Sequence, residues 1–160
     1  MNLDNNTPLA RPLHLITKDY IGALTYKLTH LDIERHFYTL VLIDNARTAI
    51  TQQELAQLLS VDKVTMSRII DYLGKKKYIL RTQNIADRRA HQLKLTEKAL
   101  KFLPEIKRAI FDLNDASLQG ISKKEVDCFL RVAERIHLNL TKLPVDTVRF
   151  KFNKVRKLKK

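Results

Sequence analysis

The sequence predicts a mainly helical chain with one short β-hairpin. On both sides of residues 78–96, apolar residues recur at three- and four-residue steps, which is typical of amphipathic helices. Between these stretches, "YILRT" and "HQLKLT" alternate apolar and polar residues, as half-buried strands do. A length of 160 residues with only three glycines suits one folded domain, 1–160.

Two helices are expected in the first part of the chain. Residues 1–10 are polar and predict a loose arm. From Leu13 to Leu31 an apolar residue follows at every third or fourth position, which predicts one amphipathic helix. Aspartate is a favoured N-cap residue, so Asp32 would start a second helix that ends near Asn45.

Two short helices joined by a tight turn are expected next. The stretch "TQQE" at 51–54 has the form of a capping box, in which a threonine and a glutamate bind each other's backbone amides. After "SVD", Asp62 would cap a helix that carries Met66, Ile70 and Leu73 on its inner face. Two such helices form a helix-turn-helix.

The outward face of the second short helix, 63–73, suits contacts with DNA. In a helix-turn-helix this helix enters the major groove and presents its first residues to base edges. Arg68 can donate two hydrogen bonds to guanine, and Val64 can contact a thymine methyl group. An ordinary polar helix face is the alternative. The DNA contacts that we predict from this region are Thr51, Lys63, Val64, Thr65, Ser67, Arg68 and Lys75.

The loop between the two strands, 83–90, is the second candidate for a DNA contact. An arginine at a hairpin tip can enter a minor groove, where narrow A·T-rich segments concentrate negative potential. A neighbouring carboxylate can orient that arginine through charge-assisted hydrogen bonds. A solvated turn is the alternative. The contacts predicted from this hairpin, or wing, are Asp87, Arg88, Arg89 and His91.

The last part of the chain predicts two long helices and a basic tail. Thr96 would cap the first helix, which we expect to bend at Pro104 because proline lacks an amide donor. A second capping box, "SKKE" at 122–125, would open the other helix. The tail could wrap the DNA backbone, or insert Val148, Phe150 and Phe152 into a partner subunit. We therefore divide the domain into scaffold helices 12–45 and 97–145, a DNA-binding lobe 46–96 and a basic tail 148–160.

The charge distribution favours a polyanionic partner. The formal net charge is +13. Residues 1–44 hold four cations and five acids, whereas residues 45–100 hold eleven and five, and residues 101–160 fifteen and seven. Double-stranded DNA is the first candidate partner, and an anionic membrane surface is the second.

The stretches "TQQELAQLLSVDKVTMSRIIDYLGKKKYILR" and "ADRRAHQLKLTEKA" together resemble the winged helix-turn-helix of the MarR family of bacterial transcription regulators, over residues 51–100. The resemblance implies a homodimer with intertwined first and last helices and two recognition helices that read a pseudo-palindrome. It implies base or phosphate contacts from Thr65, Ser67 and Arg68. It places Arg89 in the minor groove, Asp87 as the acid that positions it, and Arg88 at a phosphate.

Two residues depart from the pattern of the family. Lys77 stands where similar members usually carry glycine, and a lysine in the left-handed conformation costs roughly 1 kcal/mol. Alternatively the helix ends early, with Gly74 as its left-handed cap. Val64 replaces a small hydroxyl residue, which would shift the base preference.

No catalytic activity, metal site or cofactor is expected. The five histidines lack metal-ligand spacing, and no serine or cysteine stands in a nucleophile motif. The one cysteine, Cys128, suits a reducing compartment, and we expect it to be buried on the apolar side of the last helix. No signal segment or membrane-length apolar run is present, so we expect a cytoplasmic protein without membrane contact.

The resemblance implies a dimeric, sequence-specific DNA-binding regulator, and members of this family are most often repressors. Many such relatives bind small aromatic anions beside the dimer helices, and the side chains that could line such a site here are Tyr20, His36, Tyr38 and Arg47. A non-specific architectural DNA-binding protein that uses the wing and the tail is the main alternative. A protein-interaction adaptor without DNA function is a third.

Overall fold

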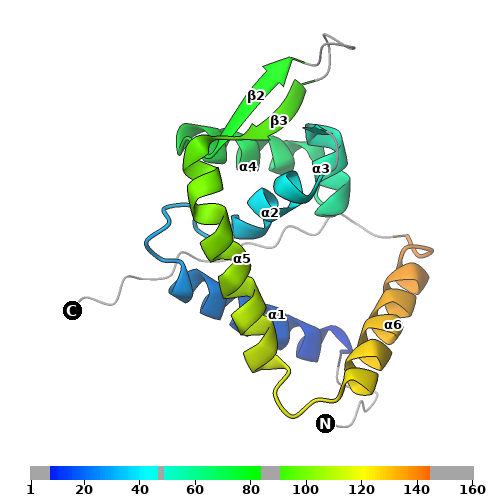
Figure 1. Ribbon diagram of the computed structural model, residues 1–160. Coiled ribbons are helices and arrows are strands. Elements are labelled where there is room, and N and C mark those ends of the chain that lie inside the picture. The colour runs from blue at the N-terminus through cyan, green and yellow to red at the C-terminus, as the bar shows by residue number, and fades with distance from the viewer. Residues whose placement is uncertain (1–7, 47–48, 84–90, 145–160) are drawn as a thin grey trace. The chain divides into compact units, whose positions relative to one another are not determined.

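The computed structural model describes residues 8–46, 49–83 and 91–144, without the side chains of residues 83 and 91. The chain forms two compact units, 1–117 and 118–160, which we describe separately (Figure 1). The first unit is mainly helical, as the sequence predicts, and the predicted hairpin is part of a three-stranded antiparallel sheet. Among the described residues, no helix has the length and apolar character that a membrane span requires.

Helix α1 spans Ala10–Lys27 and ends four residues before Leu31, the predicted end. The apolar periodicity continues past the helix because Leu28, Leu31 and Ile33 are all buried in the turns that follow it. These turns are closed by local bonds, such as the one from the Leu31 amide to the Leu28 carbonyl oxygen at 2.9 Å. The pattern therefore marks residues that reach the core rather than residues in one helix.

Helix α2 spans Phe37–Asn45, and the prediction that Asp32 caps it is wrong. His36 occupies the N-cap position without a side-chain cap bond. Glu34 has a positive φ of 50°, which is incompatible with a right-handed helix that continues from residue 32. Asp32 instead pairs with Lys76, the C-cap residue of α4, which lies 44 residues further along the chain.

The helix-turn-helix consists of α3, Gln52–Leu58, and α4, Lys63–Lys75. Both predicted caps are present: Thr51 and Glu54 form the capping box, and the Asp62 carboxylate accepts from the Thr65 amide at 2.8 Å. Between the helices, Ser60 adopts a positive φ of 50°. Its amide and that of the next residue bond back to α3, which satisfies carbonyl oxygens at the end of that helix.

The wing sheet contains β2, Ile79–Gln83, and β3, His91–Leu95, as predicted, and also a short strand β1, Ile50–Thr51, which the sequence did not reveal. The strand order is β1-β3-β2, and both pairs are antiparallel. The register sets Ile50 opposite Leu93. This pairing connects the start of the helix-turn-helix to the wing.

Helix α5, Glu97–Ser117, connects the sheet to α1 and α2 (Figure 1). The Thr96 hydroxyl accepts from the Ala99 amide at 3.2 Å, in agreement with its predicted role as a cap. The helix continues through Pro104. An ion pair of 2.6 Å between Lys107 and Asp44 fixes it to the end of α2. Its inner stripe consists of Ala99, Leu103, Ile106, Ala109 and Leu113, all buried.

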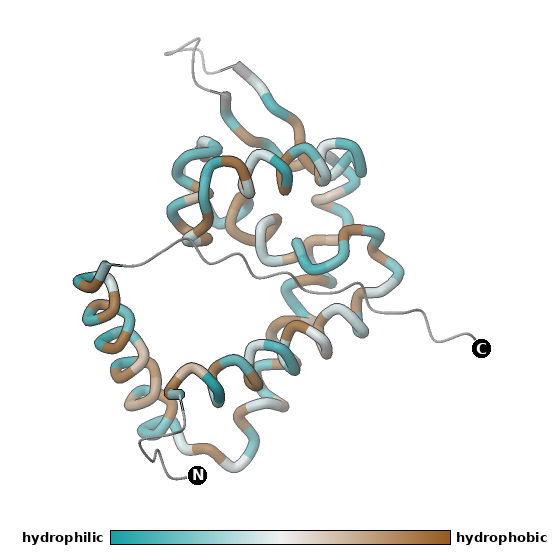
Figure 2. Tube along the Cα trace, turned by 180° about the vertical axis from the view of Figure 1, so that it is seen from behind, coloured by the Kyte–Doolittle hydropathy of each residue, from teal (hydrophilic) through white to brown (hydrophobic). Residues whose placement is uncertain are grey.

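The second unit contains α6, Lys123–Leu140, which the Ser122–Glu125 capping box opens as predicted. Before it, Gly120 adopts a φ of +79°, where glycine avoids strain. Bands of apolar and polar residues alternate along α6 (Figure 2). None of its residues is buried within the chain. Its apolar residues at three- and four-residue steps are Val126, Phe129, Leu130, Ala133, Ile136 and Leu140.

The expected burial of Cys128 is wrong for the single chain, because the thiol is exposed. Cys128 lies two residues after Val126 and one before Phe129. A step of two residues on a helix turns a side chain away from the stripe. Cys128 therefore belongs to the polar face of α6, although its neighbours in the sequence are apolar.

Candidate nucleic-acid interface

Helix α4 carries its predicted contacts on the side opposite the core. Met66, Ile70 and Leu73 are buried, with at most 1% of each side chain exposed. This burial fixes the rotation of the helix about its axis. The other side chains of the first turns then lie in or near solvent: Lys63, Val64 and Arg68 are exposed, and Thr65 and Ser67 are half-buried.

Thr65 has its hydroxyl hydrogen committed to Asp62. The hydroxyl lies 2.8 Å from Asp62 Oδ2, and an ionised carboxylate can only accept hydrogen bonds. The Thr65 hydroxyl therefore donates to Asp62 and offers only its lone pairs to another molecule. Of the groups on base edges, those lone pairs match the amino groups of adenine and cytosine.

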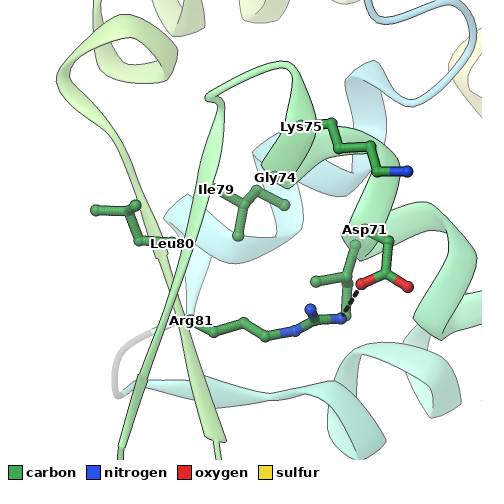
Figure 3. Close-up of a pocket in the computed structure, with 7 residues that line it drawn as sticks. Asp71, Gly74, Lys75, Ile79, Leu80 and Arg81 are labelled. Carbon is green, nitrogen blue, oxygen red and sulfur yellow. Dashed lines mark ion pairs between the residues drawn. The ribbon is translucent and has the colours of Figure 1, made fainter.

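Ser67 and Arg81 both approach Asp71 on the wing side of α4. Arg81 Nη2 lies 2.6 Å from Asp71 Oδ1, and the Ser67 hydroxyl lies 3.5 Å from Asp71 Oδ2. Figure 3 shows Arg81 of β2 and Asp71 pointing toward each other, whereas Leu80 points away from the helix. The pair thus connects α4 directly to the wing strand β2. It borders a cavity of about 550 Å³ lined also by Ile70, Gly74, Lys75, Ile79 and Leu80.

Lys63 and Arg68 differ from these residues because their charged groups are uncommitted. In the part of the chain that the structure describes, neither side chain makes an ion pair or hydrogen bond. Lys75 is also exposed, at the end of α4. Exposed lysine and arginine side chains beside hydroxyl groups can bind phosphate oxygens and the acceptor atoms on the edge of guanine.

Thr51, by contrast, is used within the fold. Its hydroxyl donates to Glu54 Oε2 at 2.8 Å and accepts from the Glu54 amide at 3.2 Å. The Thr51 amide also donates to Glu54 Oε2 at 2.7 Å, and this backbone bond lowers the pKa of the Glu54 carboxyl. A DNA contact by Thr51 would therefore be an addition to its role as a cap.

The DNA contacts predicted for the wing lie outside the described residues, with the exception of the His91 backbone. Asp87, Arg88 and Arg89 fall in the range 84–90. The His91 backbone pairs with Gln83 at the ends of β2 and β3. The strand ends thus stand at the positions from which a hairpin would extend.

The C-terminal end of α4 is closed by Lys77 and not by Gly74. Lys77 has a φ of 60°, whereas Gly74 lies inside the helix. The Lys77 amide donates to the Gly74 carbonyl oxygen, and the Tyr78 amide donates to that of Leu73, both at 2.9 Å. These two bonds define a Schellman motif. Lys77 therefore adopts the left-handed conformation at the position where similar members usually carry glycine, and it does so at a cost in strain.

The four candidate effector residues have different surroundings. The Tyr20 hydroxyl lies 2.6 Å from Asn114 Oδ1, and burial raises the pKa of the Tyr20 phenol. The His36 ring packs against that of Tyr72 with a centroid separation of 5.5 Å. Tyr38 is 52% exposed, and Arg47 lies outside the described residues. The cavity beside Asp71 and Arg81 is lined by other residues.

Comparison with known proteins identifies the fold and the family. The sequence model of the MarR family matches residues 34–91. The structure of the transcriptional regulator SlyA is 25% identical, with a TM-score of 0.76 over 85% of this chain and 96% of that one. MarR from E. coli in its apo form is 27% identical, with a TM-score of 0.63 over 81% and 97%. The chain belongs to the MarR family of transcriptional regulators.

A third MarR-family structure resembles this fold. It is a transcriptional regulator from Listeria monocytogenes complexed with a 26mer DNA, and it is 22% identical, with a TM-score of 0.74 over 85% of this chain and 91% of that one. The MarR family consists of regulators and not of enzymes. Among the described residues of this MarR-family chain, no cluster of histidine, cysteine and acidic side chains could hold a metal ion.

Sequence reasoning missed the ion pair between Asp71 and Arg81 in this MarR-family chain. Each residue alone looks like an ordinary surface charge, since Asp71 lies on an amphipathic helix and Arg81 in an alternating strand. The sequence indicates this ion pair only when the position of Arg81 is considered together with its partner across the sheet. Arg81 pairs with buried Leu93 across the sheet, so it lies on the side of β2 that faces α4.

Proposed function

We propose that this MarR-family chain is a homodimeric, sequence-specific DNA-binding regulator. In the proposal, helix 63–73 enters the major groove and the wing 83–90 reaches the adjacent minor groove. The observation that carries it is the division of α4 into a buried face and a face with uncommitted cations. Burial of Met66, Ile70 and Leu73 holds Arg68 outward, where its guanidinium can bind guanine bidentately.

The other outward residues of α4 supply different chemistry. Val64 is 54% exposed and can contact a thymine methyl group. Thr65 can accept from a base amino group, and Lys63 and Lys75 can neutralise phosphates. The complex of the Listeria relative with a 26mer DNA supports this use of the fold.

The homodimer is supported by the apolar stripe of α6. Phe129 is 49% and Leu130 58% exposed in the single chain, and the stripe runs the length of the helix. A continuous apolar face of this kind is usually an interface, because its exposure to water costs free energy. A second copy of the chain is the occupant that we propose, since a two-fold dimer would present two recognition helices to an inverted repeat.

Repression is the simplest regulatory outcome that we propose. A dimer on a promoter covers about two turns of DNA and competes with the transcription machinery for it. An aromatic or anionic effector bound near Tyr20, His36, Tyr38 or Arg47 would release the dimer by changing the separation of the recognition helices. These four side chains support an effector site because their phenol, imidazole and guanidinium groups can bind an aromatic or anionic molecule.

Selection of bound duplexes from random DNA tests the proposal. A specific dimer should enrich an inverted repeat whose half-sites lie about 10 bp apart, centre to centre. The non-specific architectural alternative is favoured by the net charge of +13 and by seven cations in 148–160. It would enrich no sequence, and its affinity would fall steeply with salt because phosphate contacts dominate. Enriched sites without a dyad would contradict the dimer.

A further inference from the structure

Asp32, in the turns between α1 and α2, contacts the end of the recognition helix. Its Oδ2 pairs with the ammonium group of Lys76, the C-cap residue of α4. The bond with Asp32 raises the pKa of the Lys76 ammonium. The two residues are 44 positions apart, so the contact joins two separate segments of the first unit.

Tyr72 makes a second contact between the same segments. Its hydroxyl donates to the Asp32 backbone oxygen at 3.3 Å, and its ring packs against that of His36. The Lys76 ammonium lies 5.9 Å from the centre of the Tyr72 ring. Both contacts act on the C-terminal end of α4, which the strained Lys77 closes.

The start of α5 holds the same helix end from another side. The Lys98 ammonium donates to the Lys76 carbonyl oxygen at 3.0 Å, and the Thr96 hydroxyl donates to that of Lys77 at 2.7 Å. Side chains at the start of α5 therefore hold the backbone that follows α4, and Asp32 joins the same helix end to the turns between α1 and α2.

We propose that Asp32 is a positioning residue for the recognition helix, and that its contacts with Lys76 and Tyr72 set which half-site spacing the dimer accepts. This inference rests on the proposed function, because spacing has meaning only for a dimer on two half-sites. It assigns to Asp32 no contact with DNA.

The length of α4 makes its outer end sensitive to such a contact. At 1.5 Å per residue, the helix Lys63–Lys75 is about 20 Å long. A tilt of about 6° about its last turn moves the first turn by about 2 Å. Opposite tilts in the two subunits change the separation of the recognition helices by about 4 Å, close to the rise of one base pair of about 3.4 Å.

The test is the affinity of the full-length protein for duplexes with two identical half-sites separated by the selected spacer or by one base pair more or less. We expect Asp32→Asn and Lys76→Met each to reduce the preference for the selected spacer about two- to fivefold, the size expected for an exposed pair. The double variant should lose no more than either single variant. Asp32→Glu should keep the preference.

The sign of the Asp32→Asn effect separates positioning from simple electrostatics. Loss of a carboxylate from a DNA-binding protein should by itself strengthen binding to every duplex, whereas loss of the positioning contact weakens binding to the selected spacer. Lys101→Met is the matched control for Lys76→Met, because Lys101 is an exposed lysine in α5. It should lower affinity equally for all spacers.

A readout without DNA completes the test. The amides of Lys76, Lys77 and Tyr78 bond within the end of α4 and should exchange hydrogen faster in Asp32→Asn than in wild type. A wild-type spacer preference that Asp32→Asn and Lys76→Met leave unchanged would overturn this inference alone. Equal binding of the wild type to all spacers would overturn the proposed function with it.

Discussion

The Tyr78 amide donates a hydrogen bond of 2.9 Å to the carbonyl oxygen of Leu73, and this bond terminates α4. Both side chains are buried, with at most 1% of each exposed, so the helix end is anchored in the core. The bond requires a left-handed residue between them, and Lys77 supplies it with a φ of 60°. Helix α4 thus ends at a fixed position although residue 77 is not a glycine.

Lys77→Gly should stabilise the protein. Glycine reaches the left-handed region without the steric cost that lysine incurs, so we expect the free energy of unfolding to rise by up to about 1 kcal/mol. Urea denaturation measures it. Lys75→Gly is the control, because residue 75 is helical and glycine there should lower stability by about 1 kcal/mol. Equal destabilisation by both changes would contradict the role of Lys77.

His36 should make stability fall in mild acid. Burial, followed by the charge of Arg35, lowers the pKa of the His36 imidazole below its ordinary value of 6.5. Below pH 6.5 the unfolded chain therefore binds a proton that the folded chain does not, and stability decreases until the pH falls through the folded-state pKa. Thermal unfolding across this range should show a smaller decrease for His36→Asn. An unchanged pH profile would mean that His36 contributes nothing.

Arg68→Ala should relax base preference at one position of each half-site. The loss of a bidentate contact with guanine costs about 1–3 kcal/mol of binding free energy. Titrations on operators that differ only at that base pair measure the change. Arg108→Ala is the control, since Arg108 is an exposed arginine of α5 that pairs with Asp112. If Arg68→Ala weakens binding to all four base pairs equally, Arg68 contacts phosphate instead.

Phe129→Glu should convert the dimer into a monomer. A carboxylate in the apolar stripe of α6 would have to be desolvated at the interface. Sedimentation equilibrium gives the mass, and circular dichroism confirms that the variant remains helical. Cys128→Glu adds the same charge to the polar face of α6, about 100° around the helix from Phe129, and should leave the dimer intact. A dimeric Phe129→Glu protein would rule out this face as the interface.

Arg89→Ala and Arg88→Ala should differ in their dependence on sequence. Removal of Arg89 should weaken binding mainly to operators with narrow A·T-rich flanks, whereas removal of Arg88 should act equally on all operators. Affinities for matched operators with A·T-rich or G·C-rich flanks measure the difference. Equal losses for Arg89→Ala on both would exclude readout of minor-groove shape.

The features that the sequence predicts well are those whose partners are close in the chain. Thr51, Asp62 and Ser122 each bind an amide three residues later, so local spacing was sufficient to place the starts of α3, α4 and α6. The buried face of α4 follows in the same way from a regular period. The outward position of Arg68 could therefore be derived before the structure.

The features that were missed depend on distant partners. Aspartate is a residue type that often caps helices, but Asp32 instead accepts hydrogen bonds from Lys76 and Tyr72, which lie 40 or more residues away. Strand β1 has two residues and exists only because β3 pairs with it. No local pattern distinguishes these outcomes from a helix start and a loop. The contacts around α4 therefore required the three-dimensional structure.

The most direct test of the central claim is the ratio of two affinities at physiological salt. One is measured for a duplex that carries both selected half-sites, and the other for the same duplex with its bases shuffled. A sequence-specific regulator should bind the first at least about 10³-fold more tightly. A ratio near one, with both affinities falling steeply and equally with salt, would contradict the account.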